Sequence, residues 1–309
     1  MNLIAKAKEA GSLLKRTYIE WMEDEPFDLS SSVAYYAIFS LPALLIIIIS
    51  IAGIAFGREA VQGQISSQIG GMIGPQAGKD IQEMIANAYK SDTSVISSII
   101  GVATLLFGAT GVFLQVQKSL NRVWDVKVDP NAGIKKLVLD RATSLGIIVA
   151  IGFMMLISLV VTTGLSALSD WIQNRLPDFI LYIFYVVNFL VSLGIVTMLF
   201  AIIFKVLPDV KLKWHHVWIG AGVTAVLFEI GRFALGLYFG KSEPASAYGA
   251  AGTVILMMLW VFYSCLILFF GAQFTQVYAK RKDKSLRPSE HAVQVKIVEH
   301  TEPNGVLKS

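Results

Sequence analysis

Six apolar stretches, each long enough to cross a lipid bilayer, constrain the fold of this chain more than any other feature. A helix needs about 20 apolar residues to span the hydrocarbon layer, whereas the strands of a membrane barrel alternate polar and apolar residues over about ten positions. The continuous runs therefore predict an all-α polytopic membrane protein with six transmembrane helices. The runs are Val33–Phe56, Val95–Val116, Thr143–Leu168, Phe179–Phe204, Val217–Phe239 and Tyr248–Tyr278.

The composition agrees with a membrane protein and argues against an enzyme. Hydrophobic residues make up 55% of the chain and charged residues 16%, and the mean hydropathy is +0.62, too apolar for one soluble core. Cys265 is the only cysteine, and the adjacent His215 and His216 cannot share one helical face. Phosphate loops, HExxH motifs and clustered carboxylates are also missing from the sequence. We therefore expect no cofactor, no metal site and no catalytic residues.

The basic residues predict the orientation of the chain. Segments on one side of the six runs, including both termini, carry 20 of the 26 lysines and arginines, whereas segments on the other side carry five. Because cytoplasmic loops are enriched in Lys and Arg, both termini are expected in the cytoplasm. This pattern accounts for the net charge of +4 without nucleic acid as a partner, and it favours contact with anionic lipids at the cytoplasmic face.

Three parts of the chain are distinguished by their patterns. Residues 1–28 place apolar side chains at helical spacing between basic ones, which is typical of an amphipathic helix lying in the membrane interface. Residues 29–280 form the transmembrane domain, and their long extracytoplasmic loop, 57–94, predicts two amphipathic helices separated by the breaker Gly74–Gly78. Residues 281–309 are polar and are expected to form a disordered cytoplasmic tail.

Glu229 and Arg232 are the leading candidates for a functional site. They lie within the fifth apolar run, three residues apart, so a helix would place them on one face where they can pair. An ionised residue near the bilayer centre costs about 2.5–3.5 kcal/mol, and such groups usually face a partner, a cavity or a pathway. The pair is therefore interpreted either as a site for an anionic solute and its coupling ion or as a structural link between helices.

Weaker signals add further candidates. Asn188 is a polar residue in the fourth run, and Tyr248 opens the glycine-rich start of the sixth run, where a ligand could reach the backbone. Small residues and prolines within the runs predict close helix contacts or kinks. The positions expected to serve helix packing are Gly146, Gly236, Gly240 and Pro42.

Several segments together resemble the YihY/BrkB family of bacterial inner-membrane proteins, which includes a virulence factor linked to serum resistance. The resemblance covers about residues 10–280 and depends on Ala34–Pro42, Leu120–Val126, Leu207-Pro208, Tyr248-Gly249-Ala250, Leu259-Trp260 and Gly271-Ala272-Gln273. It implies a multi-pass protein of the bacterial inner membrane. Some relatives carry a ribonuclease label, for which this sequence offers no acid–base or metal cluster. Many relatives are expected to have an acidic residue at Gln273, so this position counts against proton or ion coupling here.

Two functions follow from these patterns. One is a transporter or permease of a small anionic or amphipathic solute, including a lipid, with Glu229, Arg232, Asn188, Tyr248 and Gln273 as solute or coupling candidates. The other is a non-transporting membrane scaffold or an envelope factor associated with virulence. The substrate, the coupling ion and a homo-oligomeric state are left open by the sequence.

Overall fold

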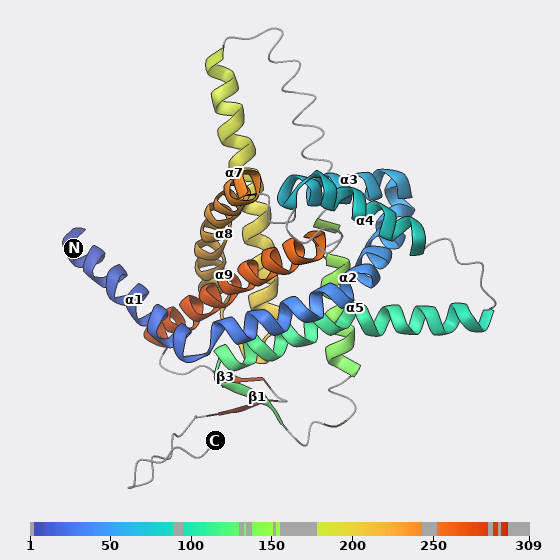
Figure 1. The fold of residues 1–309 in the computed structure, drawn as a ribbon. Coiled ribbons are helices and arrows are strands. Elements are labelled where there is room, and N and C mark those ends of the chain that lie inside the picture. Colours follow the sequence, from blue (N-terminus) through green and yellow to red (C-terminus); the bar gives the residue numbers. More distant parts are fainter. Residues whose placement is uncertain are drawn as a thin grey trace.

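The computed structural model describes residues 3–88, 95–129, 133, 138–150, 153–154, 178–242, 252–283, 287–289 and 292–295. Helices dominate, and four short strands lie together at one end of the molecule (Figure 1). The elements are α1 (Leu3–Glu23), α2 (Pro26–Phe56), α3 (Arg58–Ile73), α4 (Pro75–Ala88), α5 (Val95–Val123), β1 (Val126–Val128), α7 (Asp178–Val206), β2 (Val210–Lys211), α8 (Trp214–Ser242), α9 (Gly252–Lys282), β3 (Arg287–Pro288) and β4 (Ala292–Gln294).

Within the described residues, four helical segments are long and apolar enough to cross a membrane. They are Pro26–Ser50, Val186–Val206, Trp214–Tyr238 and Gly252–Lys282. The second predicted run lies within the long helix α5. The third run is helical over residues 143–150 and 153–154, and the rest of it lies outside the described residues. The structure therefore shows an all-α membrane protein, with four of the six expected spans meeting the criteria of length and hydropathy.

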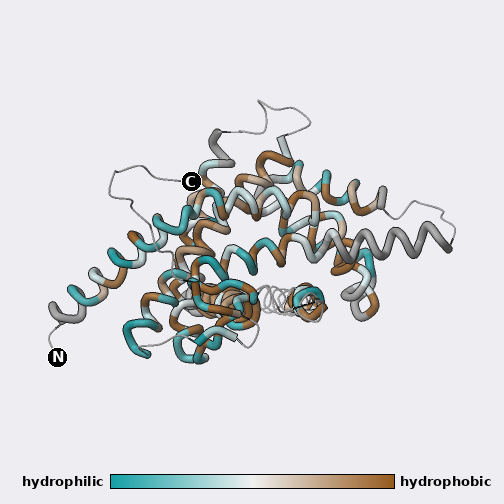
Figure 2. Tube along the Cα trace, turned by 90° about the horizontal axis from the view of Figure 1, so that it is seen from below, coloured by the Kyte–Doolittle hydropathy of each residue, from teal (hydrophilic) through white to brown (hydrophobic). Residues whose placement is uncertain are grey.

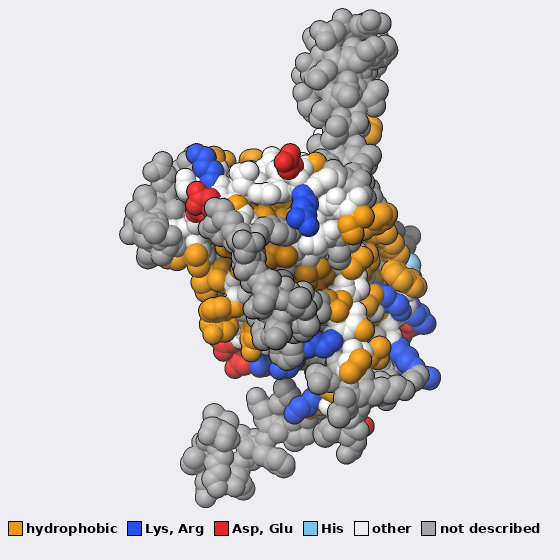
Figure 3. Space-filling view, turned by 90° about the vertical axis from the view of Figure 1, so that its right-hand side faces the viewer, with side chains coloured by type: hydrophobic (Ala, Val, Ile, Leu, Met, Phe, Trp, Pro, Cys, Tyr) orange, Lys and Arg blue, Asp and Glu red, His pale blue; other side chains and the backbone are white. Residues whose placement is uncertain are grey.

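The outer surface is apolar across the middle of the molecule. Large hydrophobic side chains such as Phe39, Ile54 and Phe233 are exposed, and Ile54 retains 88% of its accessible area. Figure 3 shows hydrophobic side chains over the central part of one face, with charged residues above and below them. Figure 2 shows that hydrophobic residues are spread along the long helices, in contrast to α1, where hydrophilic residues are frequent. Apolar surface of this extent is expected where lipid replaces water.

Helix α2 packs against α5 and α9 along the centre of the structure. A Cβ added to Gly108 would lie 3.5 Å from Ala43 Cβ, and one added to Gly111 would lie 3.4 Å from Ser40 Oγ, so α5 approaches α2 closely on both sides of Pro42. Pro42 lies inside α2, which continues as one helix to Phe56. Pro42 thus lies on the stretch of α2 that α5 approaches, and its role in helix packing stays a prediction.

Helices α8 and α9 cross through two reciprocal glycine–threonine contacts. A Cβ on Gly220 would lie only 2.8 Å from Thr275 Cβ, and a Cβ on Gly271 only 2.8 Å from Thr224 Cβ. Each threonine hydroxyl donates to the carbonyl four residues earlier on its own helix, Thr224 to Gly220 and Thr275 to Gly271, both at 2.7 Å. Each helix therefore inserts a threonine where the other lacks a side chain, which lets the two backbones approach closely.

Two of the predicted packing glycines have no close neighbour among the described residues. Within that part of the chain, a Cβ on Gly146 or on Gly236 would meet no atom within 4 Å, whereas one on Gly231 would lie 2.5 Å from the Tyr263 ring. The surroundings of Gly240 lie outside the described side chains. The packing role of Gly146 and Gly236 therefore stays a prediction, because small-residue spacing shows where helices can approach, but not which face has a neighbour.

Helices α3 and α4 form the hairpin expected in the long loop, with the turn at Gly74, whose φ of 116° favours glycine. Their apolar faces are buried together with residues from α2 and α9: Val61, Ile65, Ile81, Ile85, Leu45, Ile49, Leu256 and Met257. Figure 1 shows this hairpin beside the end of α2, away from the strands. The hairpin therefore covers the ends of α2 and α9 that lie opposite the strands.

The C-terminal tail is not disordered along its whole length, contrary to the prediction for residues 281–309. Strand β4 pairs with β1, with Lys127 opposite Val293, and β3 pairs with β2, with Val210 opposite Pro288, both antiparallel. Strands of two or three residues have no detectable period, and their stability depends on partners that composition does not reveal. Residues 284–286, 290–291 and 296–309 lie outside the described residues.

Candidate solute-binding site

Glu229 and Arg232 form an ion pair on α8, as their spacing predicts. Arg232 Nη2 and Nε donate to Glu229 Oε2 at 2.7 and 3.1 Å. The side chain of Glu229 is 12% exposed and that of Arg232 is 48% exposed. The carboxylate is therefore largely covered, while the guanidinium reaches accessible space.

The pair lines a cavity of about 770 Å³. This volume is in the range of sites that enclose small molecules, about 300–1,000 Å³. The walls come from the consecutive helices α7 and α8 and from α3, which is far from both in the sequence. Its lining residues are Ser67, Gln68, Gly71, Phe189, Glu229, Ile230, Arg232, Phe233, Gly236 and Leu237.

The cavity combines one polar end with an apolar wall. Phe189, Phe233 and Leu237 supply hydrophobic surface, and Gln68 from α3 adds an amide. Arg232 uses two of its nitrogens on Glu229, so the N–H groups of Nη1 stay available to an acceptor in the cavity. An anionic group with an apolar tail fits this arrangement best.

Gly236 contributes to the cavity. In the described part of the structure, no atom lies within 4 Å of a Cβ added there, and the residue lines the cavity wall. Sequence reasoning did not identify Phe189, Gln68 or Ser67, because they reach the cavity from α7 and α3 and carry no local signal. Their contribution depends on how the helices pack.

The other candidates lie elsewhere. Asn188 is exposed on α7 and does not line the cavity, although the next residue, Phe189, does. Tyr248 lies outside the described residues. Gln273 is 2% exposed on α9 and belongs to a separate polar cluster that includes Glu20 of α1. The structure therefore brings together Glu229 and Arg232 but separates them from Gln273.

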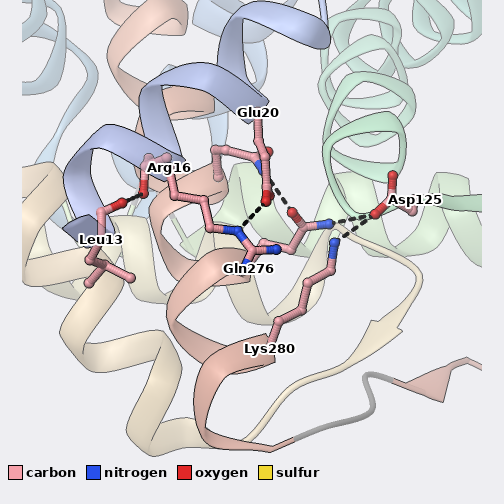
Figure 4. Close-up of polar contacts among 8 residues, drawn as sticks. Leu13, Arg16, Glu20, Asp125, Gln276 and Lys280 are labelled. Carbon is pink, nitrogen blue, oxygen red and sulfur yellow. Dashed lines mark hydrogen bonds and ion pairs between the residues drawn. The ribbon is translucent and has the colours of Figure 1, made fainter. Parts of the chain in front are cut away.

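The cluster around Gln273 connects α1, α9 and the turn after α5 (Figure 4). Gln273 Nε2 donates to Glu20 Oε2 at 2.9 Å and to Gln276 Oε1 at 2.7 Å. Gln276 Nε2 and Lys280 Nζ both donate to Asp125 Oδ2, at 3.0 and 2.9 Å. The amide of Gln273 thus holds a chain of contacts across three elements.

Asp24, at the end of α1, lies near these acidic residues. Burial, followed by repulsion from Asp125, raises the pKa of Asp24 from 3.8 to about 7, although Arg122 and Lys280 oppose the shift. A carboxyl with a pKa near neutrality changes its charge within the physiological pH range. Asp24, at the end of α1, is therefore a group whose charge changes near neutral pH.

A second buried polar group fixes the segment before α8 to α5. Asn121 Nδ2 donates to Asp209 Oδ2 at 2.8 Å, and Asp209 N donates to Asn121 Oδ1 at 2.8 Å. Gln117 Nε2 adds a bond of 3.2 Å to the same carboxylate oxygen. Both Asn121 and Asp209 are buried, so their side chains satisfy one another where water has little access.

Histidine does not form a metal site with its neighbours in the part of the chain that the structure describes. His216 Nδ1 lies 3.7 Å from Asp283 Oδ2, and the rings of His215 and His216 are 5.9 Å apart. Among the described residues, no three His, Cys, Asp or Glu side chains are grouped to hold a metal ion.

Comparison with known proteins identifies the family. The family profile described as Virulence factor BrkB matches residues 17–295. This chain belongs to the BrkB family. The matched region extends from the second half of α1 through β4, so the paired part of the tail is included.

Curated relatives of this BrkB-family chain are UPF0761 membrane proteins. The chain is 26% identical to one from Alteromonas mediterranea over 84% of its own length and 85% of the relative. It is 24% identical to one from Vibrio vulnificus over 93% and 88% of the two chains. The match to one from Verminephrobacter eiseniae, 28% identical, covers 57% of this chain but only 40% of the longer relative. No solved structure gives a significant match.

These findings make the chain a multi-pass bacterial membrane protein. The apolar helices, the family profile and the relatives named as membrane proteins agree on this point.

Proposed function

We propose that this BrkB-family protein is a transporter of a small amphipathic anion, such as an anionic lipid, in the bacterial cytoplasmic membrane. The cavity at Glu229 and Arg232 carries the proposal, because it combines a partly free guanidinium with an aromatic and aliphatic wall. Its walls come from α3, α7 and α8, so relative movement of these helices changes access to the site. The proposal involves no catalytic step, cofactor or nucleic acid.

The proposed topology has six spans with both termini in the cytoplasm. Support comes from contacts among the basic segments that the charge pattern assigns to that side. Arg122 in the last turn of α5 pairs with Glu25 at 2.5 Å, and Lys213 before α8 pairs with Asp283 at 2.8 Å. The β1–β4 and β2–β3 ladders join the same segments. These contacts agree with a single cytoplasmic face, where the basic residues would meet anionic lipids.

Binding would proceed by exchange of partners at Arg232. An entering anion accepts hydrogen bonds from the free nitrogen of the guanidinium and then takes the place of Glu229 at one of its two donors, while its apolar part covers Phe189 and Phe233. Glu229 holds Arg232 in position and neutralises it when the cavity is empty, which avoids an unpaired charge within the membrane. Release follows when Glu229 regains both donors.

Transport by the purified full-length protein in proteoliposomes tests this function. Fluorescent phosphatidylglycerol serves as the anionic probe and fluorescent phosphatidylcholine as the zwitterionic one. Arg232→Ala should abolish movement of the anionic probe, and Glu229→Gln should slow it. Arg281→Ala is the matched control, since it removes an arginine that pairs with Glu9 at 2.9 Å, away from the cavity. If both cavity variants inserted normally and moved phosphatidylglycerol at the wild-type rate, the site would be abandoned.

A second function is favoured by the ion pair itself. In a non-transporting scaffold or envelope factor, the contact of 2.7 Å between Arg232 and Glu229 would only stabilise α8. The double variant Glu229→Arg/Arg232→Glu would then keep its cellular function, because the reversed pair can still form. Loss of function by a swapped protein of normal stability counts against the scaffold.

A further inference from the structure

A second cavity lies at the end of the molecule that carries the strands, and it has a different character. It has a volume of about 430 Å³, within the range of about 300–1,000 Å³ typical of ligand sites. The end of α5, the strand β1 and the residue after β4 form its walls. The lining residues are Lys118, Asn121, Arg122, Asp125, Val126, Lys127, Val128 and Val295.

Only some of the charged side chains that line this second cavity have ion-pair partners among the described residues. Arg122 Nη2 is paired with Glu25 Oε2 at 2.5 Å, and Asp125 Oδ2 is paired with Lys280 Nζ at 2.9 Å. In the part of the chain that the structure describes, no ion-pair partner is found for Lys118 or Lys127. Two positive charges at the cavity are therefore not balanced.

The carboxyl end of α5 opposes this charge only weakly. A helix C-terminus carries the equivalent of about −0.5 elementary charge, which is small against two lysine ammonium groups. Asp125 does not reverse the balance, since its Oδ2 accepts from both Gln276 and Lys280. The cavity therefore favours an anion of charge about −2, as carried by a phosphate monoester or a pyrophosphate.

The C-terminal tail completes the cavity. Val295 N donates to Asp125 O at 2.9 Å, which closes one wall directly after β4. Asp125 itself has a φ of 52°, and this left-handed turn directs the chain from α5 into β1. Val126, Val128 and Val295 are the apolar residues of the cavity lining.

We infer that the cavity between α5, β1 and the residue after β4 binds a phosphate group, held by Lys118 and Lys127. The phosphate comes either from a lipid whose headgroup is a phosphate monoester or from a soluble phosphate monoester, since both present a charge of about −2 and the same acceptors. This site lies apart from Glu229 and Arg232 and shares no lining residue with their cavity. Its occupancy does not depend on whether the protein transports a solute.

Thermal unfolding of the full-length protein in phosphatidylcholine nanodiscs tests the inference, because a ligand that binds the folded state raises the unfolding midpoint. Phosphatidic acid added to the nanodisc and inorganic pyrophosphate added to the buffer are the two probes. A rise with phosphatidic acid alone identifies a lipid source, whereas a rise with pyrophosphate identifies a soluble one. A rise with neither probe would overturn the inference.

Matched variants distinguish binding at this cavity from general attraction to surface charge. Lys118→Gln/Lys127→Gln should raise the half-saturating probe concentration about tenfold, as expected when charge-assisted hydrogen bonds are lost. Lys15→Gln/Lys282→Gln removes the same charge from exposed positions outside the cavity. This variant should change the half-saturating probe concentration less than about twofold. An equal loss in both variants would show attraction to the surface rather than a site. Elution profiles compared with the wild type establish that each variant is folded.

Discussion

A single methyl group at Gly271 tests the reciprocal contact between α8 and α9. The Cβ of Gly271→Ala would lie 2.8 Å from both Cβ and Cγ2 of Thr224, so no rotamer of that threonine removes the overlap. Overpacking of this kind lowers the free energy of unfolding by up to about 3 kcal/mol. The higher helix propensity of alanine raises it by about 1 kcal/mol. A net destabilisation of about 2 kcal/mol is expected.

Gly236→Ala is the matched control, since it also replaces a helical glycine by alanine, on α8 instead of α9. Among the described residues, a Cβ at Gly236 meets no atom within 4 Å, so only the helix-propensity gain of about 1 kcal/mol applies. The two variants should therefore change stability in opposite directions.

The assay is thermal unfolding of the two purified proteins in one detergent, followed by loss of the monodisperse peak in size-exclusion chromatography. At about 2 °C per kcal/mol, the midpoint of Gly271→Ala should fall by about 4 °C and that of Gly236→Ala should rise by about 2 °C. Equal midpoints for the two variants would show that α8 and α9 do not cross at these residues.

Three further changes test other parts of the structure. Asp24→Asn should flatten the pH dependence of stability. The folded-state pKa of Asp24 is raised from 3.8 to about 7, so the contribution of this carboxyl to stability is fully present below about pH 4 and is lost as the pH rises through 7. The expected loss of stability is about 2 kcal/mol, which is half of the value that the full pKa shift implies, because solvent reaches this carboxyl. A variant that keeps the wild-type pH profile would contradict the assignment. Asn121→Ala should lower stability by about 1–3 kcal/mol, because Asp209 loses a donor and an acceptor, and an unchanged unfolding midpoint would count against the contact. Deletion of residues 285–309 should increase the proteolysis of the segment at Val126–Val128 by removing β4, and an unchanged cleavage pattern would argue against the ladder.

Local patterns in the sequence predict those features whose cause is local. The break at Gly74 between α3 and α4 is one, because glycine and proline interrupt an apolar period within a few residues. The Glu229–Arg232 pair is another, because a separation of three residues places both side chains on one helical face. The long apolar helices follow directly from the hydropathy of the chain.

Features that depend on packing between distant segments were not predictable in the same way. Gly220 and Gly271 contact threonines of another helix, whereas Gly146 and Gly236 have no such neighbour among the described residues. The cavity needs Phe189 and Gln68 from helices that the sequence cannot place beside Glu229. In each case the residue type permits the contact, and only the tertiary arrangement of the helices determines whether it forms.

The two short ladders also set an order for biosynthesis. Strands β1 and β2 belong to segments that leave the ribosome well before their partners, which are residues 292–294 and 287–288 near the end of the chain. The helices preceding Lys282 are synthesised and inserted while those edges are still unpaired. The end of the molecule that carries the strands can therefore close only after Val295 has been synthesised, when the helices that it joins have already been made.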